Sequence, residues 1–418
     1  MYIPEIIGSN YFVNTSNGTK VKYLNLDNAA TTPTFRPLLD KISEYLETYG
    51  SVHRGSGQKS QISTAIYEEA IPIIMDFLNV TTDEYALIPM HNSTSLINKL
   101  TRMLQLTNED TIYLSEFEHS SNDLPWRKEA QIVRIPIDKA EQLNTGYLED
   151  MLRKNTGNGR KIVVVTGASN VTGTITPIHS IAKMAHTHGA TIVVDAAQLV
   201  AHREIKLRGN MSGEEIDFIV FSGHKMYAPF GGAVIVGRKD ILEKMTPDDV
   251  GGGNIDFVLP DSYDLSKDFN KRMMAGSPNA LGLVSLALSC VFIKKHIGFQ
   301  DIFNHEQNIL NRAKSQFSSL AGIQTYCDLD YDSNKKCSIL TFNLEGIHPG
   351  IVAARLGHEY GIGVRQGTIC QFLYVAKLLE LSTEQVRAAR QAVLSDKMDS
   401  MYGIVRASFG LDNKPEDV

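Results

Sequence analysis

Seven short apolar runs between residues 85 and 240 constrain the fold of this 418-residue chain more than any other feature. They read YALIPM, TIYLSEF, QIVRIPI, KIVVVTGAS, TIVVDAAQ, DFIVFSG and GGAVIVG, and amphipathic stretches such as IHSIAKMAHTHGA separate several of them. Strands that alternate with helices are typical of a mostly parallel sheet with helices on both faces. We therefore predict an α/β fold with a mostly parallel seven-stranded sheet.

A change of pattern near residue 282 indicates a second domain. A long helical stretch begins there, and the strand-like SILTFNL and the helix-like IVAARLGHEYG follow it. Chains longer than about 250–300 residues usually divide into more than one core. We predict an N-terminal segment at 1–22, a large domain at 23–281 and a smaller α+β domain at 282–418. The closing LDNKPEDV begins like a capped helix and then stops, which leaves undecided whether the C-terminus is shortened.

Charge and hydropathy argue against several classes of partner. The 41 Lys and Arg residues are balanced by 47 Asp and Glu residues, and no basic run offers a surface for a nucleic acid backbone. The start MYIPEIIGSNYF lacks the regions of a signal peptide, and no window approaches about 18 uninterrupted apolar residues. We expect a cytoplasmic protein that acts on a small molecule, without nucleic acid or membrane partners.

The cysteines limit the metal and redox chemistry to be expected. None has C-x-x-C spacing and none lies in a histidine pattern, which argues against a zinc site and against a disulfide framework. At most one of them is expected to matter chemically. The four are Cys290, Cys327, Cys337 and Cys370.

Lys225 lies in DFIVFSGHKMYAPFGGAVIVG, between an apolar run and a glycine-rich turn. A lysine in such a place is usually a surface residue or half of an ion pair. Here Ser222, Gly223 and His224 supply hydroxyl, backbone and imidazole donors beside it. Donors around a partly buried amine suit a phosphorylated carbonyl cofactor, and a desolvated lysine can form the Schiff base that anchors pyridoxal phosphate. Lys225 is therefore the candidate anchor of pyridoxal 5′-phosphate.

Asp195, in TIVVDAAQLV, fits the carboxylate that keeps a pyridine nitrogen protonated. A lone Asp after a strand is more often a helix cap, but Asp195 precedes Lys225 by one strand–helix–strand unit. Gln198 follows it and could donate to the ring hydroxyl oxygen. Ligands of parallel sheets gather at the carboxyl ends of the strands, so we expect the polar residues there to share one edge. They are Asn170, Asp195, Gln198, Ser222 and His224.

A phosphate group needs hydroxyl and amide donors near a helix N-terminus. The stretch PMHNSTSLINKL offers Asn92, Ser93, Thr94 and Ser95 before an apolar helical run, although such residues cap most helices. In SEFEHSSNDLPW, His119 follows a strand, where its imidazole could lie against a pyridine ring. Taken alone, His119 is more typical of a loop histidine.

The order of the motifs resembles one enzyme family. The motifs are YLNLDNAATTP, SVHRGSG, NSTSLIN, FEHSSNDLPW, GASNVTGTI, VVDAAQ, FSGHKMYAPFGG, AGSPN, VRQGTICQF and VRASFGLDN. Together they resemble the class V aminotransferase group of fold-type I enzymes, in the branch of cysteine desulfurases and selenocysteine lyases that carries an HRG near the N-terminus. The match runs from about Tyr23 to Asn413, nearly the whole chain.

The resemblance implies a role for each residue around the cofactor. Lys225 is the Schiff-base lysine, and Asp195 is the partner of the pyridine nitrogen. His119 stacks on the ring, and Gln198 donates to the phenolic oxygen. The expected phosphate ligands are Ser93, Thr94, Ser222, His224 and, from a second subunit, Ser277. The resemblance thus implies a homodimer with shared active sites.

On the substrate side, the resemblance implies that Asn170 and Arg406 bind the α-carboxylate, with His53 in the adjacent loop. Cys370 matches the cysteine that attacks the substrate sulfur, takes it as a persulfide and allows alanine to leave. The plainer interpretation of Cys370 is a small hydrophobic residue, as free cysteines often are.

Two departures from the branch lie in this part of the sequence. GTI precedes Cys370 where related enzymes commonly carry histidines, and the segment between Cys370 and Arg406 is longer than expected. That segment contains a predicted helix and could form a lid or a partner surface. A smaller departure is Gly57, at a position where a histidine is often seen.

Three functions follow from these observations. The favoured one is removal of sulfur or selenium from L-cysteine or selenocysteine, with a sulfur-acceptor protein as a partner. The second is an aminotransferase or a C–S or β-lyase that acts on another amino acid without a persulfide. The third is a scaffold that has lost activity, against which the set Lys225, Asp195, His119 and Arg406 argues.

Overall fold

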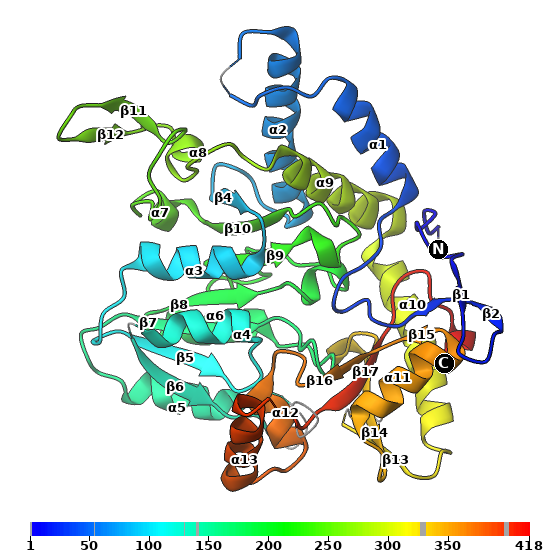
Figure 1. Cartoon of the computed structure of the whole chain (residues 1–418). Helices are drawn as coiled ribbons and strands as arrows, with labels where there is room; N and C mark the ends of the chain where they lie inside the picture. The colour runs from blue at the N-terminus through cyan, green and yellow to red at the C-terminus, as the bar shows by residue number, and fades with distance from the viewer. Residues whose placement is uncertain (1, 54, 129, 139–141, 327–331, 397–400) are drawn as a thin grey trace.

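The structure is a computed structural model of the whole chain (Figure 1). It describes residues 2–418 except 54, 129, 139–141, 327–331 and 397–400. Arg54 of the HRG motif and Cys327 lie outside the described residues.

A seven-stranded sheet forms the centre of the predicted large domain, and each predicted run is one of its strands. β10 runs antiparallel to both of its neighbours, and the remaining pairings are parallel. The predicted mostly parallel α/β sheet is therefore confirmed. In order across the sheet, the strands are β4 (Tyr85–Met90), β10 (Ala233–Arg238), β9 (Phe218–Ser222), β8 (Ala190–Asp195), β7 (Lys161–Thr166), β5 (Thr111–Ser115) and β6 (Gln131–Ile135).

Helices cover both faces of the sheet because successive strand residues point to opposite sides. In β7, Val163 and Val165 join one hydrophobic core, and Ile162 and Val164 join another. The first core includes residues of α1 (Arg36–Glu47), α2 (Gln58–Phe77), α5 (Thr145–Lys154), α6 (Ile178–Thr187) and α9 (Ala280–Val291). The second includes residues of α3 (Ser93–Leu104) and α7 (Lys239–Leu242).

The connection from β8 to β9 differs from the predicted strand–helix–strand unit. It holds a short 3-10 turn, η2 (Leu199–Ala201), in place of a helix. Its buried residues include Leu199, Val200, Ile205 and Leu207, a spacing that does not follow the 3.6-residue period of an amphipathic helix. The segment packs as a loop whose apolar side chains enter the core.

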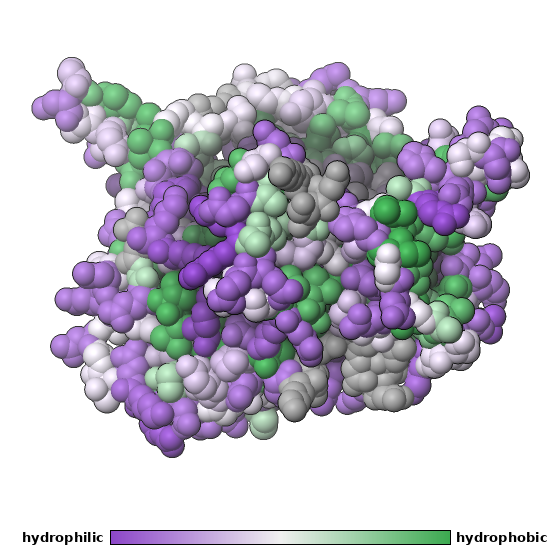
Figure 2. Space-filling model, turned by 60° about the horizontal axis from the view of Figure 1, so that its bottom comes forward, coloured by the Kyte–Doolittle hydropathy of each residue, from purple (hydrophilic) through white to green (hydrophobic). Residues whose placement is uncertain are grey.

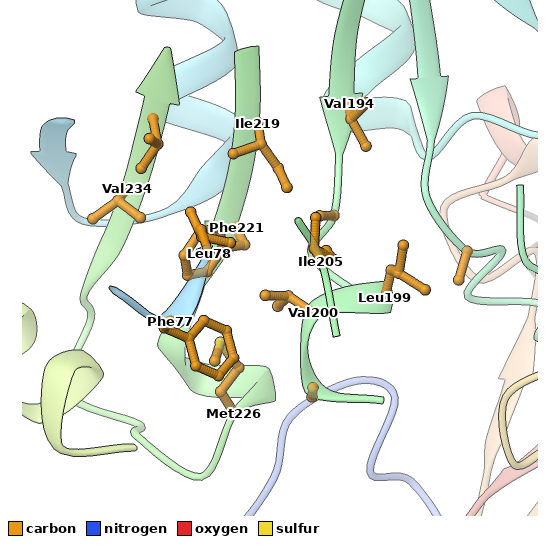
Figure 3. Close-up of a cluster of buried hydrophobic side chains, with 14 of the residues drawn as sticks. Phe77, Leu78, Val194, Leu199, Val200, Ile205, Ile219, Phe221, Met226 and Val234 are labelled. Carbon is orange, nitrogen blue, oxygen red and sulfur yellow. The ribbon is translucent and has the colours of Figure 1, made fainter. Parts of the chain in front are cut away.

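The turn after β9 rests on a cluster of buried hydrophobic side chains (Figure 3). Side chains from β8, β9 and β10 meet others from the end of α2 and from η2: Phe77, Leu78, Val194, Leu199, Val200, Ile219, Phe221, Met226 and Val234. Burial of one such side chain stabilises a fold by about 1.5–3 kcal/mol. Because Met226 directly follows Lys225, this packing fixes the backbone that carries the lysine.

The long helical stretch is broken in the structure. α9 continues into a π-helical segment at Phe292–Ile297, and Gly298, with a φ of 88°, separates this from α10 (Phe299–Phe317). α9 packs against α1 and α2 and contributes to the first core. The predicted boundary between 281 and 282 thus falls in the first turn of α9, and the domain division stays a prediction.

A four-stranded antiparallel sheet forms the centre of the C-terminal part. Its order is β13 (Ile323–Thr325), β14 (Ile339–Leu344), β17 (Ile404–Ser408) and β16 (Arg365–Gly367). α11 (Pro349–Tyr360) contacts this sheet. The segment after Cys370 forms two helices, α12 (Phe372–Leu378) and α13 (Thr383–Leu394), where one was predicted.

The N-terminal residues join this C-terminal part. β1 (Phe12–Asn14) and β2 (Lys20–Lys22) form a hairpin. β3 (Leu24–Asn25) then pairs in parallel with β15 (Ile362–Gly363). The chain therefore passes from the smaller part into the large sheet and back.

Two further features lie outside the sheets. A hairpin of β11 (Ile255–Val258) and β12 (Tyr263–Leu265), followed by α8 (Phe269–Arg272), projects from the body (Figure 1). One helical stretch, Ala280–Ile297, is long and apolar enough to cross a membrane, but 61% of it is buried inside the structure, as in the core helix of a globular protein.

Candidate active site

A cavity of about 350 Å³ lies at the carboxyl ends of the central strands. The segments that follow the strands of the large sheet contribute most of its lining, and Ala29, Ala30, Arg365, Arg406 and the loop at Ile369 and Cys370 complete it. Eleven of the predicted site residues line it: Ser93, Thr94, His119, Asn170, Asp195, Gln198, Ser222, His224, Lys225, Cys370 and Arg406. Segments far apart in the sequence thus meet at one edge of the sheet, as the strand pattern predicts.

Lys225 ends the short turn η3 (Gly223–Lys225) that follows β9. Burial lowers its pKa from 10.5 to about 8, with Arg406 acting in the same direction and Asp195 and Cys370 opposing it. Gly232, directly before β10, lies close against α9, since a Cβ on it would lie 2.0 Å from the carbonyl oxygen of Gly282. A substantial neutral fraction at neutral pH makes the Lys225 amine a nucleophile.

Asp195 ends β8, the strand beside β9, and its side chain is buried. One carboxylate oxygen accepts the backbone N–H of Ala197 at 3.0 Å. Burial raises the pKa of Asp195 above its ordinary value, and this N–H and Lys225 oppose the rise. A buried carboxylate with so few donors is stabilised by a cation placed against it.

The N-terminus of α3 provides a group of donors at the other end of the cavity. Ser93 donates its backbone N–H to the Ser222 hydroxyl at 3.0 Å, and the two hydroxyls lie 2.5 Å apart. The Thr94 hydroxyl lies 2.7 Å from that of Ser121. Burial, and then the charge of Lys225, lowers the pKa of His224 to about 4. The helix terminus and these hydroxyls favour an anion here without a cationic histidine.

His119 caps the short helix α4 (Ser120–Asp123). Its Nδ1 accepts the backbone N–H of Ser121 at 3.1 Å, which leaves the proton of the neutral ring on Nε2. Burial lowers the pKa of His119 to about 4, and the charges of Lys225 and Arg406 add to this. The ring is therefore neutral at physiological pH and suited to stacking on a flat heterocycle.

Arg406 lies on β17 and is 1% exposed. It donates to the backbone oxygen of Asn170 at 2.8 Å and to Asp27 Oδ1 at 2.7 Å, while its Nε is buried without a partner. Asp27 also pairs with Arg365, at 2.9 Å, and Arg365 lines the same cavity. One carboxylate thus holds two guanidinium groups beside the cavity, which suits a substrate carboxylate.

Cys370 is exposed and lies in a loop that the large domain holds in place. Its carbonyl oxygen accepts from the backbone N–H of Ser120 at 2.9 Å and from the Ser120 hydroxyl at 2.8 Å. Asn170 donates to the carbonyl of Ile369 at 3.1 Å. Ile369 and Cys370 both have positive φ, 51° and 58°, a conformation that is a genuine outlier for β-branched isoleucine.

The structure does not bring two predicted residues into this cavity. His53 has a φ of 72°, packs edge-on against Tyr67 and lies 3.5 Å from Glu68. Ser277 lines a separate small cavity beside Met90. The expectation for Ser277 concerned the site of a second subunit, so its role stays a prediction, as does that of His53.

Comparisons with known proteins agree with this geometry. The family model described as "Aminotransferase class-V" matches residues 24–418. The chain belongs to the class V aminotransferase family. A "Probable cysteine desulfurase" of Halalkalibacterium halodurans is 33% identical over 366 residues, 85% of each chain, and one of Pyrococcus abyssi is 32% identical over 396 residues, 94% of this chain and 90% of that protein.

Solved structures with the same fold include other desulfurases. The apo cysteine desulfurase of Thermococcus onnurineus is 28% identical with a TM-score of 0.81, over 100% of this chain and 96% of that one. A cysteine desulfurase of Escherichia coli is 25% identical with a TM-score of 0.77, over 94% and 92%. The predicted fold-type I architecture is therefore confirmed.

Class V aminotransferases use pyridoxal 5′-phosphate, and the cavity fits this cofactor. Lys225 supplies the amine, Asp195 a buried carboxylate that lacks a bonded cation, and the α3 terminus an anion site. Gln198 lines the same cavity, and its buried amide oxygen has no hydrogen-bond partner among the described residues. A cofactor with an aldehyde, a basic ring nitrogen and a phosphate matches this donor set.

Sequence reasoning missed the pair of Asp27 and Arg365. Both lie in motifs that carried the resemblance, LDNAATTP and VRQGTICQF, but neither was given a role. The sequence feature that could have pointed to them is that each is a charged residue inside one of these motifs. Their contact joins residues on opposite ends of the chain, so only the fold shows that they act together.

Proposed function

We propose that this class V aminotransferase family member is a cysteine desulfurase that removes sulfur from L-cysteine, or selenium from selenocysteine, and releases alanine. The observation that carries the proposal is the position of Cys370, which lines the same cavity as Lys225 and Arg406. The printed names of the curated relatives and of the solved structures support the same activity.

Bound pyridoxal phosphate supplies an electron sink, and the surrounding residues direct it. The Lys225 amine would anchor the cofactor and, once free of it, Nζ would take the Cα proton of the substrate. Its pKa of about 8 places this base near physiological pH. Asp195 would favour a proton on the ring nitrogen, and neutral His119 would offer a flat surface to the ring.

Cys370 carries out the sulfur transfer. Its thiolate attacks the sulfur of the bound substrate, a sulfur–sulfur bond forms and the carbon–sulfur bond breaks. The electron pair of the broken bond stays with the substrate carbon, which takes a proton on the way to alanine. The enzyme thiol is thereby oxidised to a persulfide, the substrate carbon is reduced, and no outside oxidant is needed.

The substrate carboxylate is held by the two guanidinium groups that Asp27 organises. Arg406 has an unpaired buried Nε, and Arg365 is half exposed at the cavity. The side-chain amide of Asn170 instead donates to the backbone beside Cys370. Asn170 is therefore proposed to hold the cysteine loop over the substrate.

A substrate screen with Cys370→Ser beside the parent tests this function. With L-cysteine we expect the rate of alanine formation to fall at least about 100-fold in Cys370→Ser, because serine cannot carry the sulfur. Cys290→Ala, a change at a buried cysteine outside this cavity, is the matched control and keeps the parent rate. Unchanged alanine formation, or pyruvate or a keto acid as the product, would favour the lyase or aminotransferase alternative.

The colour of the protein separates an enzyme from an inactive scaffold. Purified protein given the cofactor should absorb visible light, and Lys225→Ala should lose this absorption and lose activity at least about a thousandfold. Colourless parent protein under the same conditions would favour the scaffold.

We also propose that the enzyme works as a homodimer with shared sites. Ser277 lies outside the cavity of its own chain, and the nearby projecting hairpin exposes apolar side chains: Phe257 at 61%, Val258 at 59% and Tyr263 at 54%. Figure 2 shows a largely hydrophilic face with hydrophobic residues in small groups and along the projecting arm. Light scattering should give twice the chain mass, and a lower mass for the variant Phe257→Ser with Tyr263→Ser.

A sulfur-acceptor protein completes the proposed cycle. Cys370 is exposed, and Phe372 and Leu373 of α12 are exposed by 48% and 50% beside it. This small apolar surface is where we place the acceptor. In the double variant Phe372→Ser with Leu373→Ser, the transfer of sulfur from Cys370 to an acceptor protein should be slower than in the parent. Its transfer to a small thiol should keep the parent rate.

A further inference from the structure

A buried polar chain extends from the cavity into α10. Gln198, 5% exposed, lies with its amide nitrogen 3.0 Å from Nε2 of His202. Nδ1 of His202 contacts the Glu306 carboxylate in a short hydrogen bond. Glu306 is 3% exposed and also accepts from Arg203 at 2.5 Å. None of these contacts to His202, Arg203 or Glu306 was expected from the sequence.

One buried atom of this polar chain is unsatisfied. Oε1 of Gln198 has no hydrogen-bond partner among the residues that the structure describes, and a buried amide oxygen in that state costs free energy. The oxygen and nitrogen of an amide have almost the same shape, so the orientation must be decided from the hydrogen bonds.

The carboxylate of Glu306 fixes the protonation of the ring. Because a carboxylate only accepts, Nδ1 of His202 carries a proton. Nε2 of His202 then accepts one N–H of the Gln198 amide nitrogen, which lies 3.0 Å away. Glu306 and His202 are thereby both satisfied, and the second N–H of the Gln198 amide is left for another acceptor.

We propose that His202, held by Glu306, is a positioning residue that turns the Gln198 amide so that its nitrogen donates to the ring hydroxyl oxygen of pyridoxal phosphate. The proposal rests on the cofactor of the proposed function and not on the sulfur chemistry. It also explains why the buried carboxylate of Glu306 is retained behind the cavity, where it costs desolvation.

A hydrogen bond from Gln198 to the ring oxygen changes the pH at which the bound cofactor loses a proton. The ring oxygen is negatively charged and attracts the proton on the nitrogen that joins Lys225 to the cofactor. A hydrogen bond from Gln198 competes for that oxygen, so the nitrogen loses its proton at lower pH. The colour change that follows this proton therefore reports the orientation of the amide.

The experiment is a pH titration of the visible absorption of the cofactor-loaded protein. In Gln198→Met we expect the midpoint to rise by about one pH unit, because a hydrogen bond to a charged oxygen is lost. His202→Asn keeps a donor for Glu306 but lacks Nε2, and it should raise the midpoint by a similar amount. In the double variant the effect of His202→Asn should vanish, since it acts through Gln198.

Two further variants keep the result interpretable. Glu306→Gln retains the size of the side chain and removes the charge, and it should move the midpoint in the same direction by a smaller amount. His186→Gln changes a partly buried histidine that is paired with another carboxylate, Asp217, outside the cavity, and should leave the midpoint unchanged.

Other ionisable groups border the same cavities and are unaltered in every variant: His119, Asp195, His224, Lys225, Tyr227, His305, Arg365, Cys370 and Arg406. The proposal would be overturned if the titration midpoint of His202→Asn equalled that of the parent protein. It would also be overturned if His202→Asn still shifted the midpoint when Gln198 was already Met. Such a result would assign Oε1 to a water in the cavity of about 20 Å³ behind Gln198. Loss of alanine formation with a normal titration would instead count against the desulfurase function alone.

Discussion

The floor and the roof of the active site are built by different physical means. The floor consists of the ends of β8 and β9, where Asp195 and Lys225 stand on hydrogen-bonded strands above packed apolar side chains. The roof is the Cys370 loop, whose residues 369 and 370 take a left-handed backbone and which a few hydrogen bonds hold to the large domain. The cofactor chemistry is thus placed on rigid elements, and the sulfur carrier on a segment of low intrinsic stability.

The largest expected effect comes from the floor. Asp195→Asn removes the charge that keeps the ring nitrogen protonated, and we expect roughly a 100- to 1,000-fold loss in the rate of Cα proton removal. Exchange of the substrate Cα hydrogen with deuterium from heavy water measures that step, and the measurement does not depend on sulfur transfer to Cys370.

Asp217→Asn is the matched change for this prediction. Asp217 is also a buried aspartate of the large sheet, but it accepts from Ile192 and His186 outside the cavity. It should lower the melting temperature and leave the exchange rate per folded molecule near that of the parent. A slow exchange in both variants would mean that Asp195 acts through the fold and not through the cofactor.

The second effect is the stability of the cofactor-free protein as a function of pH. The pKa of Lys225 is about 8 in the folded state against an ordinary value of 10.5, so the unfolded chain binds a proton between these values that the folded chain does not. Folding is therefore penalised by about 3 kcal/mol below pH 8, and the penalty disappears as the pH rises through 10.5.

Chemical denaturation of the parent and Lys225→Met, both without cofactor, checks this. The parent should gain stability relative to the variant between pH 8 and 10.5. Gln371→Ala, a change at an uncharged residue beside Cys370, should show no such slope relative to the parent. A constant difference between parent and Lys225→Met across this window would refute the burial of the lysine.

The smallest expected effect comes from loosening the roof. Gln371 is 2% exposed and donates to the backbone oxygen of Phe117 at 2.7 Å. Gln371→Ala leaves that oxygen unpaired, so we expect the loop to open more often and alanine formation to slow about tenfold. The rate of Cys370 alkylation should rise, and the cofactor spectrum should stay as in the parent.

Gln300→Ala, a change at an exposed glutamine of α10, serves as the control for the roof. If Gln371→Ala altered the cofactor spectrum as much as the alkylation rate, floor and roof would not be separable parts of the site.

Local patterns were enough to predict the sheet and the floor. Strand residues alternate between two faces, and the seven apolar runs became the seven strands. The same logic puts Lys225 and Asp195 at neighbouring strand ends. It failed between β8 and β9, because a loop can bury Leu199 and Ile205 without the period of a helix.

Tertiary structure decided the contacts between distant segments. The pairing of Asp27 with Arg365, the bond from Ser120 to Cys370 and the chain from Gln198 through His202 to Glu306 all join segments far apart in the sequence. A charge or an amide in a motif does not indicate which distant partner will satisfy it. The sequence by itself determined the strands, the cofactor and its anchor, because these depend on local period and residue chemistry. The fold determined how the cysteine, the arginines and the glutamine are held, because burial and hydrogen-bond partners exist only after the chain has closed on itself.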